Sequence, residues 1–560
     1  MLQIKNLTIV HKKDLRTILE DFSLVLNRGD KAVLVGEEGN GKSTLLKWIY
    51  DPKLLSDYAE ARGTRASQGE LLGYLPQELP EEEKEKSVRA YMNGAEPDRA
   101  AGSREDLVPE ESLEDLAGLV PEESSEDPVK LARLASRLRL APALFRSEQL
   151  MGSLSGGERV KVQMAKMLLR EPDFLLLDEP SNDIDIETLE ALEKLIREFP
   201  GGVLYISHDE TLIERTANRV VLLEQLRRKS VPRATVANVD FRTFMEERRA
   251  ALMKQEQEAL SERREERKAM ERFRRISEKV EHDQGNVSRQ DPHSGRLLKK
   301  KMKAVKSLER RYEREHEEMT ERPETEAPIT IKFERQKAMP AGKTVLELRI
   351  PELRAPGEGS PAPGAAGDPN ILPAASAPHA AGRLLARDIF LRVRGPEKIC
   401  IVGPNGAGKT TLIRLIAGEL LQRPDLSMFY MPQNYEEVLP YDASPVEYLA
   451  PSGHKEEVTR VRTYLGSMKY TADEMFHPIR ELSGGQKAKL LLLKISLTEA
   501  DVLILDEPTR NLSPLSAPEI RAILRAFPGA VISVSHDRKF IQEVCPKVYT
   551  LGKEGLFPGA

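Results

Sequence analysis

Short apolar runs separated by polar turns fill the first 35 residues, which is a pattern typical of β-strands. The runs are LQIKNLTIV, FSLVLNRGD and KAVLVG, and each predicts one strand. Farther along, FLLL at 174–177 is continuously apolar and predicts a buried strand, and GGVLYIS at 201–207 predicts another. One helical stretch, VKVQMAKMLLR, precedes these two runs, and a second helix lies between them. Strands that alternate with helices in this way indicate the α/β class.

The same order of strands and helices returns in the last part of the chain. Beginning near residue 328, the runs ITIKF, TVLELRI, KICIVG, DVLILD and AVISVS follow one another. The chain therefore carries an internal repeat, which is its strongest organisational signal. A length of 560 residues allows three or four folded units. We expect one α/β domain over residues 1–240 and a second over residues 326–560.

Residues 241–325, between the repeats, follow a different pattern. Glu, Lys, Arg, Ala, Met and Leu dominate, all of them good helix formers, and apolar residues are too sparse to form a core. Acidic and basic side chains alternate, as on a long helix exposed to water. Turn residues interrupt the pattern at DQGN and DPHSG. We therefore predict two long helices folded as a hairpin with its tip near residues 285–295, the first helix about 60 Å long.

The charge of this hairpin adds a functional hypothesis. The whole chain has a net charge of −5, but residues 272–311 hold 13 Lys or Arg against 5 Asp or Glu. A charged helix is most often only a solvated surface, and that interpretation has to be weighed first. A basic, protruding tip in an acidic protein nevertheless suits a polyanion, because attraction to phosphates supplies most of the sequence-independent affinity for nucleic acids.

Composition excludes several classes of function. Cys400 and Cys545 are the two cysteines, which excludes a disulfide scaffold and a multi-cysteine metal site. No apolar run approaches about 18 residues, and the first ten residues lack the layout of a signal peptide, so we expect a soluble, cytoplasmic protein with no membrane segment. Residues 80–127 are acidic and predict an insertion of loops and short helices. Residues 355–382 are rich in Pro, Ala and Gly and predict a loop.

Both α/β repeats place a glycine-rich loop between an apolar strand and a helix. The loops read GEEGNGKST at 36–44 and GPNGAGKTT at 403–411, and both fit GxxxxGK[ST], the phosphate-binding loop. Backbone N–H groups of such a loop surround the phosphates, its Lys reaches the β and γ oxygens, and its Ser or Thr hydroxyl binds Mg²⁺. The predicted ATP-binding residues of the first loop are Gly36, Gly39, Asn40, Gly41, Lys42, Ser43 and Thr44. Those of the second loop are Gly403, Asn405, Gly406, Ala407, Gly408, Lys409, Thr410 and Thr411.

Further motifs follow each loop in one order: a Gln, an LSGG sequence that opens a helix, a strand ending in Asp-Glu, and a strand followed by His. Two carboxylates at the end of a strand suit Mg²⁺ binding by the Asp and polarisation of a water molecule by the Glu. Glu179 and Glu507 are therefore predicted catalytic residues, and the family that these motifs together resemble implies the same role for His208 and His536. The same resemblance implies that the remaining ATP-binding residues are Gln77, Ser155, Gly156, Gly157, Gln433, Ser483, Gly484 and Gly485. The predicted Mg²⁺ ligands are Ser43, Asp178, Thr410 and Asp506, to which the resemblance adds Gln77 and Gln433.

These motifs, twice in one chain and joined by a charged linker of about 80 residues, resemble the ABC-F family of ATPases. The similarity covers essentially the whole chain. It implies two P-loop ABC-type nucleotide-binding domains joined by a helical hairpin, with ATP and Mg²⁺ as cofactors. It also implies a monomer with an intramolecular sandwich, in which each phosphate-binding loop faces the LSGG motif of the other domain.

The resemblance also implies a partner. ABC-F proteins act in the E site of the ribosome, here a 70S ribosome, where the hairpin reaches toward the rRNA of the peptidyl-transferase centre and the P-site tRNA. Residues 509–516, TRNLSPLS, look like the branch that protects bacterial ribosomes from antibiotics. We therefore expect binding in the ATP-bound state, protection against peptidyl-transferase-centre or exit-tunnel drugs, and release on hydrolysis. Ser513 stands where the first repeat has Asp185, so we expect two unequal ATP sites.

Other functions remain open at this point. An ABC-F factor that acts on stalled ribosomes without conferring drug resistance fits every motif except TRNLSPLS. The ATPase subunit of a drug exporter fits the two ATP-binding domains but not their fusion through a basic hairpin. A DNA-repair ATPase of the ABC type is disfavoured, because such proteins carry zinc-binding cysteines or far longer coiled coils, and the sequence has neither.

Overall fold

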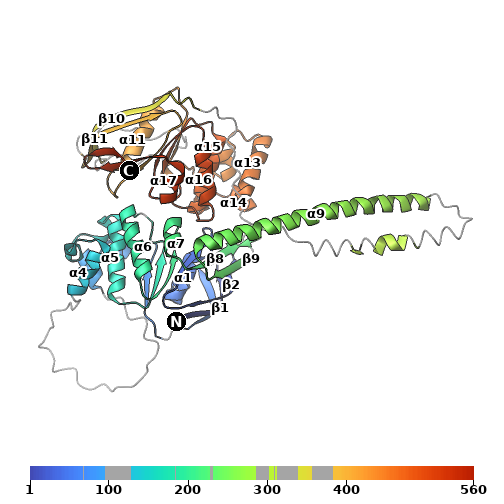
Figure 1. Cartoon of the computed structure of the whole chain (residues 1–560), viewed down its shortest axis with the longest axis horizontal. Helices are drawn as coiled ribbons and strands as arrows, with labels where there is room; N and C mark the ends of the chain where they lie inside the picture. The colour runs from blue at the N-terminus through green and yellow to red at the C-terminus, as the bar shows by residue number, and fades with distance from the viewer. Residues whose placement is uncertain are drawn as a thin grey trace, which may run out of the picture. The chain divides into compact units, whose positions relative to one another are not determined.

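The computed structural model describes residues 1–66, 69–94, 128–182, 184–226, 231–285, 300, 302–307, 310–311, 339–355, 382–468 and 470–559. Two compact units make up the chain (Figure 1). The first comprises Met1–Phe241 with Ala327–Ala560, and the second comprises Arg242–Glu326. Most of the predicted acidic insertion, nearly all of the predicted hairpin tip and most of the predicted Pro/Ala/Gly-rich loop lie outside the described residues.

The N-terminal half of the first unit, residues 1–241, is called the first cassette below. Its main sheet has six strands in the order β5-β6-β7-β3-β8-β9. The strands are β3 (Lys31–Val35), β5 (Leu72–Leu75), β6 (Phe174–Asp178), β7 (Gly202–Ile206), β8 (Arg219–Gln225) and β9 (Val231–Ala237). All pairs are parallel except β8 with β9. Every residue of β3, β6 and β7 is buried, because both faces of a parallel sheet are covered.

Helices connect the strands of this sheet, as parallel pairs require. They are α1 (Lys42–Tyr50), α2 (Glu81–Lys84), α3 (Val88–Asn93), α4 (Pro128–Leu138), α5 (Gly156–Leu169), α6 (Ile186–Glu198) and α7 (Glu210–Thr216). Short 3₁₀ turns lie at Pro52–Leu55, Pro142–Arg146 and Met151–Ser153. The helices α1 and α5 begin directly at the glycine-rich loop and at the LSGG motif, which places both motifs at helix N-termini.

A smaller antiparallel sheet in the order β2-β1-β4 completes the first cassette. Its strands are β1 (Leu2–His11), β2 (Thr17–Leu26) and β4 (Ala59–Ala66). Alternate apolar residues such as Phe22, Leu24 and Leu26 are buried, and they join Trp48 of α1 and Phe174 of β6 in one core. The three strands predicted from the first 35 residues are therefore confirmed as β1, β2 and β3.

The described residues between 339 and 559 form the second cassette and repeat this architecture. Its six-stranded sheet has the equivalent order, β13-β14-β15-β12-β16-β17. The strands are β12 (Lys398–Val402), β13 (Met428–Met431), β14 (Val502–Asp506), β15 (Ala530–Val534), β16 (Lys547–Gly552) and β17 (Gly555–Pro558), and a separate antiparallel pair is β10 (Thr344–Arg354) with β11 (Leu384–Arg394). The helices are α11 (Lys409–Leu421), α12 (Pro445–Leu449), α13 (Lys455–Ser467), α14 (Ala472–Phe476), α15 (Gly484–Leu497), α16 (Ala517–Ala526) and α17 (Arg538–Val544), with 3₁₀ turns at Tyr435–Glu437 and Ile479–Glu481. The internal repeat of the sequence is thus a repeat of topology.

Charged side chains connect the two cassettes within the first unit. Arg521 of α16 donates two hydrogen bonds, of 2.7 and 3.1 Å, to the carboxylate of Glu210 in α7. Only 3% of the Arg521 side chain and 6% of the Glu210 side chain are exposed. Arg538 of α17 donates to Glu193 and to Asp209, both at 3.1 Å. A buried ion pair of this kind is sensitive to the removal of either partner, since the other charge would remain buried.

The second unit consists mainly of α9 (Phe241–Gly285), drawn in green in Figure 1. Its 45 residues correspond to about 68 Å at 1.5 Å per residue. Ion pairs one turn apart, such as Arg242 with Glu246 (3.2 Å) and Arg274 with Glu278 (2.9 Å), support a helix of so few apolar residues. Residues 300, 302–307 and 310–311 are also helical, and the rest of the predicted second arm lies outside the described residues. Across the described part of the chain, no helix is both long enough and apolar enough to cross a membrane.

Candidate nucleotide-binding sites

The first glycine-rich loop connects β3 to α1 and is closed around a buried lysine. A Cβ on Gly36 would lie 2.3 Å from the carbonyl oxygen of Leu223, so only glycine fits there. The Asn40 side chain donates to the same carbonyl at 3.0 Å, which anchors the loop to β8. Lys42 Nζ donates to the carbonyl oxygens of Gly36 (2.9 Å) and Glu37 (3.0 Å). Burial lowers the pKa of Lys42, although nearby carboxylates act in the opposite direction.

The second glycine-rich loop repeats this geometry between β12 and α11. A Cβ on Gly403 would lie 2.5 Å from the carbonyl oxygen of Leu551. Lys409 Nζ donates to the carbonyl oxygens of Gly403 (2.9 Å) and Pro404 (3.0 Å). Burial lowers the pKa of Lys409 as well. Both loops therefore hold an ammonium group and the N-terminus of a helix at one place, which favours an anion there.

An aspartate at the end of a buried strand faces the hydroxyl of each loop. Ser43 Oγ donates to Asp178 Oδ1 at 2.8 Å, and the hydroxyl of Thr410 bonds to Asp506. Among the described residues, the second carboxylate oxygen of Asp178 and that of Asp506 are buried without a hydrogen-bond partner. Burial raises the pKa of both carboxyl groups to about 6. A buried, unpartnered carboxylate oxygen beside a hydroxyl is a donor set that fits a hard cation such as Mg²⁺.

Glu179 follows Asp178 and is held by three side chains. Its carboxylate accepts hydrogen bonds from Gln77 Nε2 (2.8 Å) and Asn182 Nδ2 (2.6 Å), and His208 Nε2 lies 3.1 Å away. Burial by itself would raise the pKa of Glu179, but the contact and charge of His208, the charge of the buried lysine and the Asn182 bond lower it to about 2. Glu179 is therefore a fixed, ionised carboxylate.

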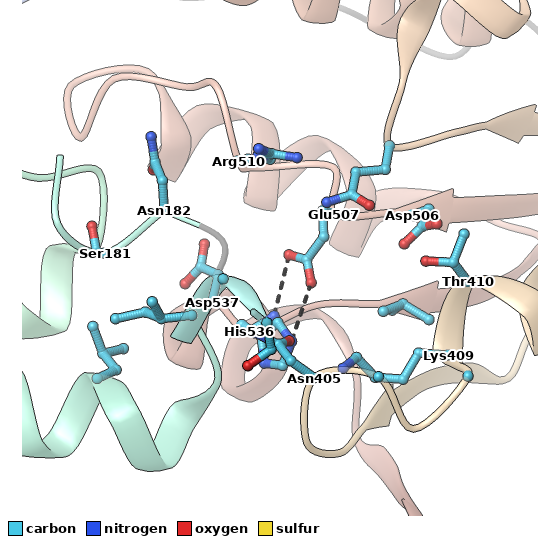
Figure 2. A pocket seen from close by; sticks show the side chains of 18 of the residues that line it. Ser181, Asn182, Asn405, Lys409, Thr410, Asp506, Glu507, Arg510, His536 and Asp537 are labelled. Atoms are coloured by element: carbon cyan, nitrogen blue, oxygen red, sulfur yellow. Dashed lines mark hydrogen bonds and ion pairs between the residues drawn. The ribbon is translucent and has the colours of Figure 1, made fainter. Parts of the chain in front are cut away.

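Glu507, the equivalent residue of the second cassette, has a different environment. The backbone N–H of His536 donates to it at 3.2 Å, and His536 Nε2 lies 3.9 Å from its other oxygen (Figure 2). Burial and the neighbouring charge of Asp506 raise the pKa of Glu507 to about 8. Burial and the charge of Lys409 lower the pKa of His536 to about 4. Both Glu179 (φ 49°) and Glu507 (φ 53°) adopt the left-handed backbone region, which is uncommon for residues other than glycine and is found at functional sites.

Each LSGG motif lies at the N-terminus of a 14-residue helix. Ser155 caps α5 and Ser483 caps α15, and each forms a capping box, with Glu158 and Gln486 respectively. Gly157 lies against Thr188, whose Oγ1 would be 3.2 Å from a Cβ at that position. The first glycines of each helix leave room for a group to approach the backbone N–H donors of the first turn.

A cavity of about 630 Å³ joins the first cassette's LSGG motif to the second cassette's loop (Figure 2). The predicted residues that line it are Ser155, Gly156, His208, Asn405, Gly406, Gly408, Lys409, Thr410, Thr411, Gln433, Asp506, Glu507 and His536. Gly157, Gly403 and Ala407 are not among its lining residues. The size is within the range of small-ligand sites. Residues 155–156 and 405–411, far apart in sequence, therefore meet at one site.

The first cassette's loop meets the LSGG motif of the second cassette. Two acidic residues of the loop, Glu37 and Glu38, contact α15 there, and His208 Nδ1 lies 2.7 Å from the carbonyl oxygen of Leu512. The predicted residues gathered on this side are Gly36, Gly39, Asn40, Gly41, Lys42, Ser43, Thr44, Gln77, Asp178, Glu179, His208, Ser483, Gly484 and Gly485. Two composite sites thus exist, each with parts from both cassettes.

Sequence reasoning missed several residues at these sites. Arg159, Asn182 and Arg510 line the cavity of the second site, and the two loop glutamates lie at the first. Asn182 and Arg510 occupy the same position after the two Asp-Glu strand ends. This equivalence in the repeat could have identified both of them as candidate site residues. Arg159 carried no signal of its own, because a charged residue near the start of a helix is common.

The sequence profile of the family described as ABC transporter matches residues 19–182 and 386–510, more than half of the chain. Each match includes one glycine-rich loop, one LSGG motif and one Asp-Glu strand end. Among solved structures, a protein described as RNase-L Inhibitor aligns with a TM-score of 0.53 and 18% identity, over 98% of this chain and 90% of that one. This likeness shows the tandem-cassette fold alone.

Three curated proteins are similar over nearly the whole chain. ABC transporter F family member 5 of Arabidopsis thaliana is 27% identical over 566 residues, 95% of this chain and 72% of that protein. Ribosome protection protein VmlR of Bacillus subtilis (strain 168) is 26% identical over 550 residues, 97% of this chain and 85% of that protein. Tylosin resistance ATP-binding protein TlrC of Streptomyces fradiae is 29% identical over 584 residues, 99% of this chain and 97% of that protein. Together with the paired loops and carboxylates, these matches show that the chain belongs to the ABC transporter family and is an ABC-F ATPase with two ATP-binding cassettes, similar to members of the antibiotic-resistance branch.

Proposed function

We propose that this ATPase binds the E site of the 70S ribosome in its ATP-bound state and protects it from antibiotics of the peptidyl-transferase centre or exit tunnel. The observation that carries the proposal is similarity, over nearly the whole chain, to a ribosome protection protein and a tylosin resistance protein. The TRNLSPLS segment supports the same branch. Basic residues of the second unit, such as Lys300, Lys303 and Lys306, suit contact with the phosphates of rRNA and P-site tRNA. A monomer is part of the proposal, because both composite sites are built within one chain, and so is a cytoplasmic location, because the proposed partner is the 70S ribosome.

Lys42 and Lys409, with the backbone N–H groups of their loops, bind the phosphates of ATP in this mechanism. Ser43 with Asp178, and Thr410 with Asp506, would hold Mg²⁺, because each pair offers a hydroxyl and a buried, unpartnered carboxylate oxygen, and Gln77 and Gln433 are further candidate ligands. When bound, Mg²⁺ offsets the negative charge of the phosphate oxygens. The N-terminal amides of α5 and α15 complete each site from the opposite cassette, so that nucleotide binding favours closure of the two cassettes.

Glu179 and Glu507 orient the attacking water and accept its proton. Glu179 is positioned for this by Gln77, Asn182 and His208. His208 also contacts the carbonyl oxygen of Leu512 in the other cassette, so its position depends on closure. The two ring nitrogens of His208 thus contact one acceptor in each cassette, the Glu179 carboxylate and the Leu512 carbonyl oxygen. Hydrolysis removes the terminal phosphate and with it the contacts that hold the two cassettes closed. The cassettes then open, and the protein leaves the ribosome.

The test compares the native protein with a Glu179→Gln, Glu507→Gln double variant in a drug-sensitive bacterium. A panel of peptidyl-transferase-centre drugs and macrolides is used. We expect the native protein alone to raise tolerance to some of them. The double variant should bind ATP without turnover and stay with 70S ribosomes in sedimentation, because the carboxylates act in hydrolysis and not in nucleotide binding.

A matched control replaces two exposed glutamates of the same cassettes, Glu190→Gln and Glu499→Gln. This control removes the same charge away from both loops and should behave like the native protein. If the double catalytic variant sediments apart from ribosomes in the presence of ATP, the ATP-bound state is not the ribosome-binding state. Unchanged drug tolerance with intact ribosome binding would instead indicate a general translation factor that acts on stalled ribosomes.

A further inference from the structure

Glu38 of the first loop occupies the N-terminus of α15 in the other cassette. Its carboxylate accepts hydrogen bonds from the backbone N–H of Gly484, at 3.2 Å, and from that of Gly485. These are the first two residues of the helix after the cap Ser483, and their N–H groups have no partner within the helix. A Cβ on Gly485 would lie 2.7 Å from Glu38 Oε2 and 2.9 Å from the carbonyl oxygen of Asn511, so glycine is what allows this approach.

Glu37, the preceding residue, contacts side chains of the same cassette rather than these amides. Its carboxylate accepts hydrogen bonds from Lys489 Nζ (2.8 Å) and Ser516 Oγ (2.7 Å). The Glu37 side chain is 20% exposed and that of Lys489 is 12% exposed. The two loop glutamates therefore have separate roles: Glu37 forms a half-buried ion pair, and Glu38 holds the helix N-terminus.

The second composite site uses the opposite arrangement of charge. The loop residues equivalent to Glu37 and Glu38 are the neutral Pro404 and Asn405. There the carboxylate comes from the first cassette, because Asp185 accepts a hydrogen bond from the backbone N–H of Asn405. Ser513 replaces that aspartate at the first site. Each interface thus has a carboxylate that bonds backbone N–H groups of the opposite cassette, but at the first site it is carried by the phosphate-binding loop itself.

The position of the Glu38 carboxylate has a consequence for nucleotide binding. The amides at a helix N-terminus favour one anion, and a carboxylate tethered within the same site competes with any phosphate for them. Glu38 as a residue remains exposed, so its side chain is free to rotate into water when it is displaced. In the proposed function the terminal phosphate of a triphosphate would bind these same amides and displace the carboxylate, whereas a nucleoside diphosphate would leave the carboxylate in place.

We propose that Glu38 is a tethered competitor for the terminal phosphate of the nucleotide, and that it determines the specificity of the first site. The carboxylate closes this site in the absence of a triphosphate, and the first site consequently prefers triphosphate over diphosphate less strongly than the second site does. The inference rests on the two loops being nucleotide sites, which the proposed function shares. It does not depend on the ribosome.

The experiment measures nucleotide affinity at the first site of the full chain. A Lys409→Ala background removes the lysine of the second loop, and titration calorimetry with Mg²⁺ then compares ADP with a non-hydrolysable ATP analogue. Glu38→Asn introduces the residue that the second loop has at this position. We expect this change to raise the preference for the analogue over ADP by about tenfold, equivalent to about 1.4 kcal/mol.

Two further variants separate competition from a general effect of charge. Glu37→Gln removes the same charge from the same loop but leaves Glu38 on the amides, and should shift the affinities for both nucleotides equally. Glu38→Gln is nearly isosteric and serves if the asparagine variant fails to fold. An equal shift for ADP and the analogue in the Glu38 variants would overturn the proposal. Absence of all nucleotide binding in the Lys409→Ala protein would contradict the assignment of the first loop as a nucleotide site, and a negative drug-tolerance assay would leave the Glu38 result unaffected.

Discussion

Glu507 is expected to make ATP hydrolysis at the second site depend on pH. Burial and the charge of Asp506 raise its pKa to about 8. At pH 7 only about a tenth of the molecules then carry the carboxylate that accepts a proton from water, and at pH 9 about nine tenths carry it. The kcat/KM of the second site should therefore rise by nearly a factor of ten between about pH 7 and about pH 9.

The other groups at the two sites make this change interpretable. Glu179 has a pKa of about 2 and is ionised throughout that range. The pKa of His536 is lowered to about 4, so its ring stays neutral, and Asp506, with a pKa of about 6, is largely ionised above pH 7. A glutamate side chain accepts a proton only in its deprotonated, carboxylate form. A pKa raised to about 8 therefore makes activity increase with pH between about pH 7 and about pH 9, whereas a pKa lowered far below this range leaves activity constant across it.

The assay compares the Glu179→Gln protein, in which Glu507 is the remaining catalytic carboxylate, with the Glu507→Gln protein. The kcat/KM for ATP is measured over this pH range at saturating Mg²⁺, because kcat/KM reports ionisations of the free enzyme. The Glu179→Gln protein should show the rise, and the Glu507→Gln protein should be flat. A flat profile for Glu179→Gln, or equal slopes for the two variants, would refute the argument that burial shifts Glu507.

Three other changes test the packing around the sites. Asp178→Asn should raise the melting temperature of the nucleotide-free protein, because a buried carboxylate oxygen without a hydrogen-bond partner destabilises the fold. In the same melting assay, the substitution should abolish the stabilisation that Mg²⁺-ATP provides. A lower melting temperature of the nucleotide-free variant would contradict this argument. Gly41→Ala should weaken ATP binding by at least about tenfold. Gly41 has a φ of 83°, which favours glycine, and an added Cβ would lie 2.1 Å from Cγ2 of Ile18. Unchanged ATP affinity in an equilibrium titration would show that the loop relaxes freely. Arg521→Ala should destabilise the contact between the cassettes by about 3 kcal/mol or more, because it leaves Glu210 buried with one fewer partner, and denaturant unfolding followed by a probe in each cassette should show earlier separation.

Local patterns were sufficient to predict much of the fold. The runs KAVLVG, FLLL and GGVLYIS predict strands because apolar residues dominate them, and they lie in the buried strands β3, β6 and β7 of the first sheet. The glycine-rich loops were predictable because GxxxxGK[ST] needs glycine wherever backbone approaches backbone, as Gly36 approaches Leu223. The long helix α9 was predictable because helix formers and one-turn ion pairs act within a few residues.

The inequality of the two sites was expected from Ser513, but its physical basis was not predictable. Ser513 is buried, and its hydroxyl accepts a hydrogen bond from the backbone N–H of Leu515. The larger difference comes from Glu37 and Glu38, which lie at positions of the loop motif that any residue can occupy. Their partners Lys489 and Gly485 are more than four hundred positions away in sequence, so no local pattern connects them.

The sequence by itself determined the strands, the loops, the order of the motifs and the tandem repeat, because each depends on short-range periodicity or on residues adjacent in the chain. The tertiary structure decided which residues share a site. It also decided that Glu179 has a pKa of about 2 and Glu507 a pKa of about 8, although both follow an aspartate at the end of a buried strand. The physical reason is that burial and hydrogen bonding depend on side chains brought together from distant segments, which the equivalent local sequences do not distinguish.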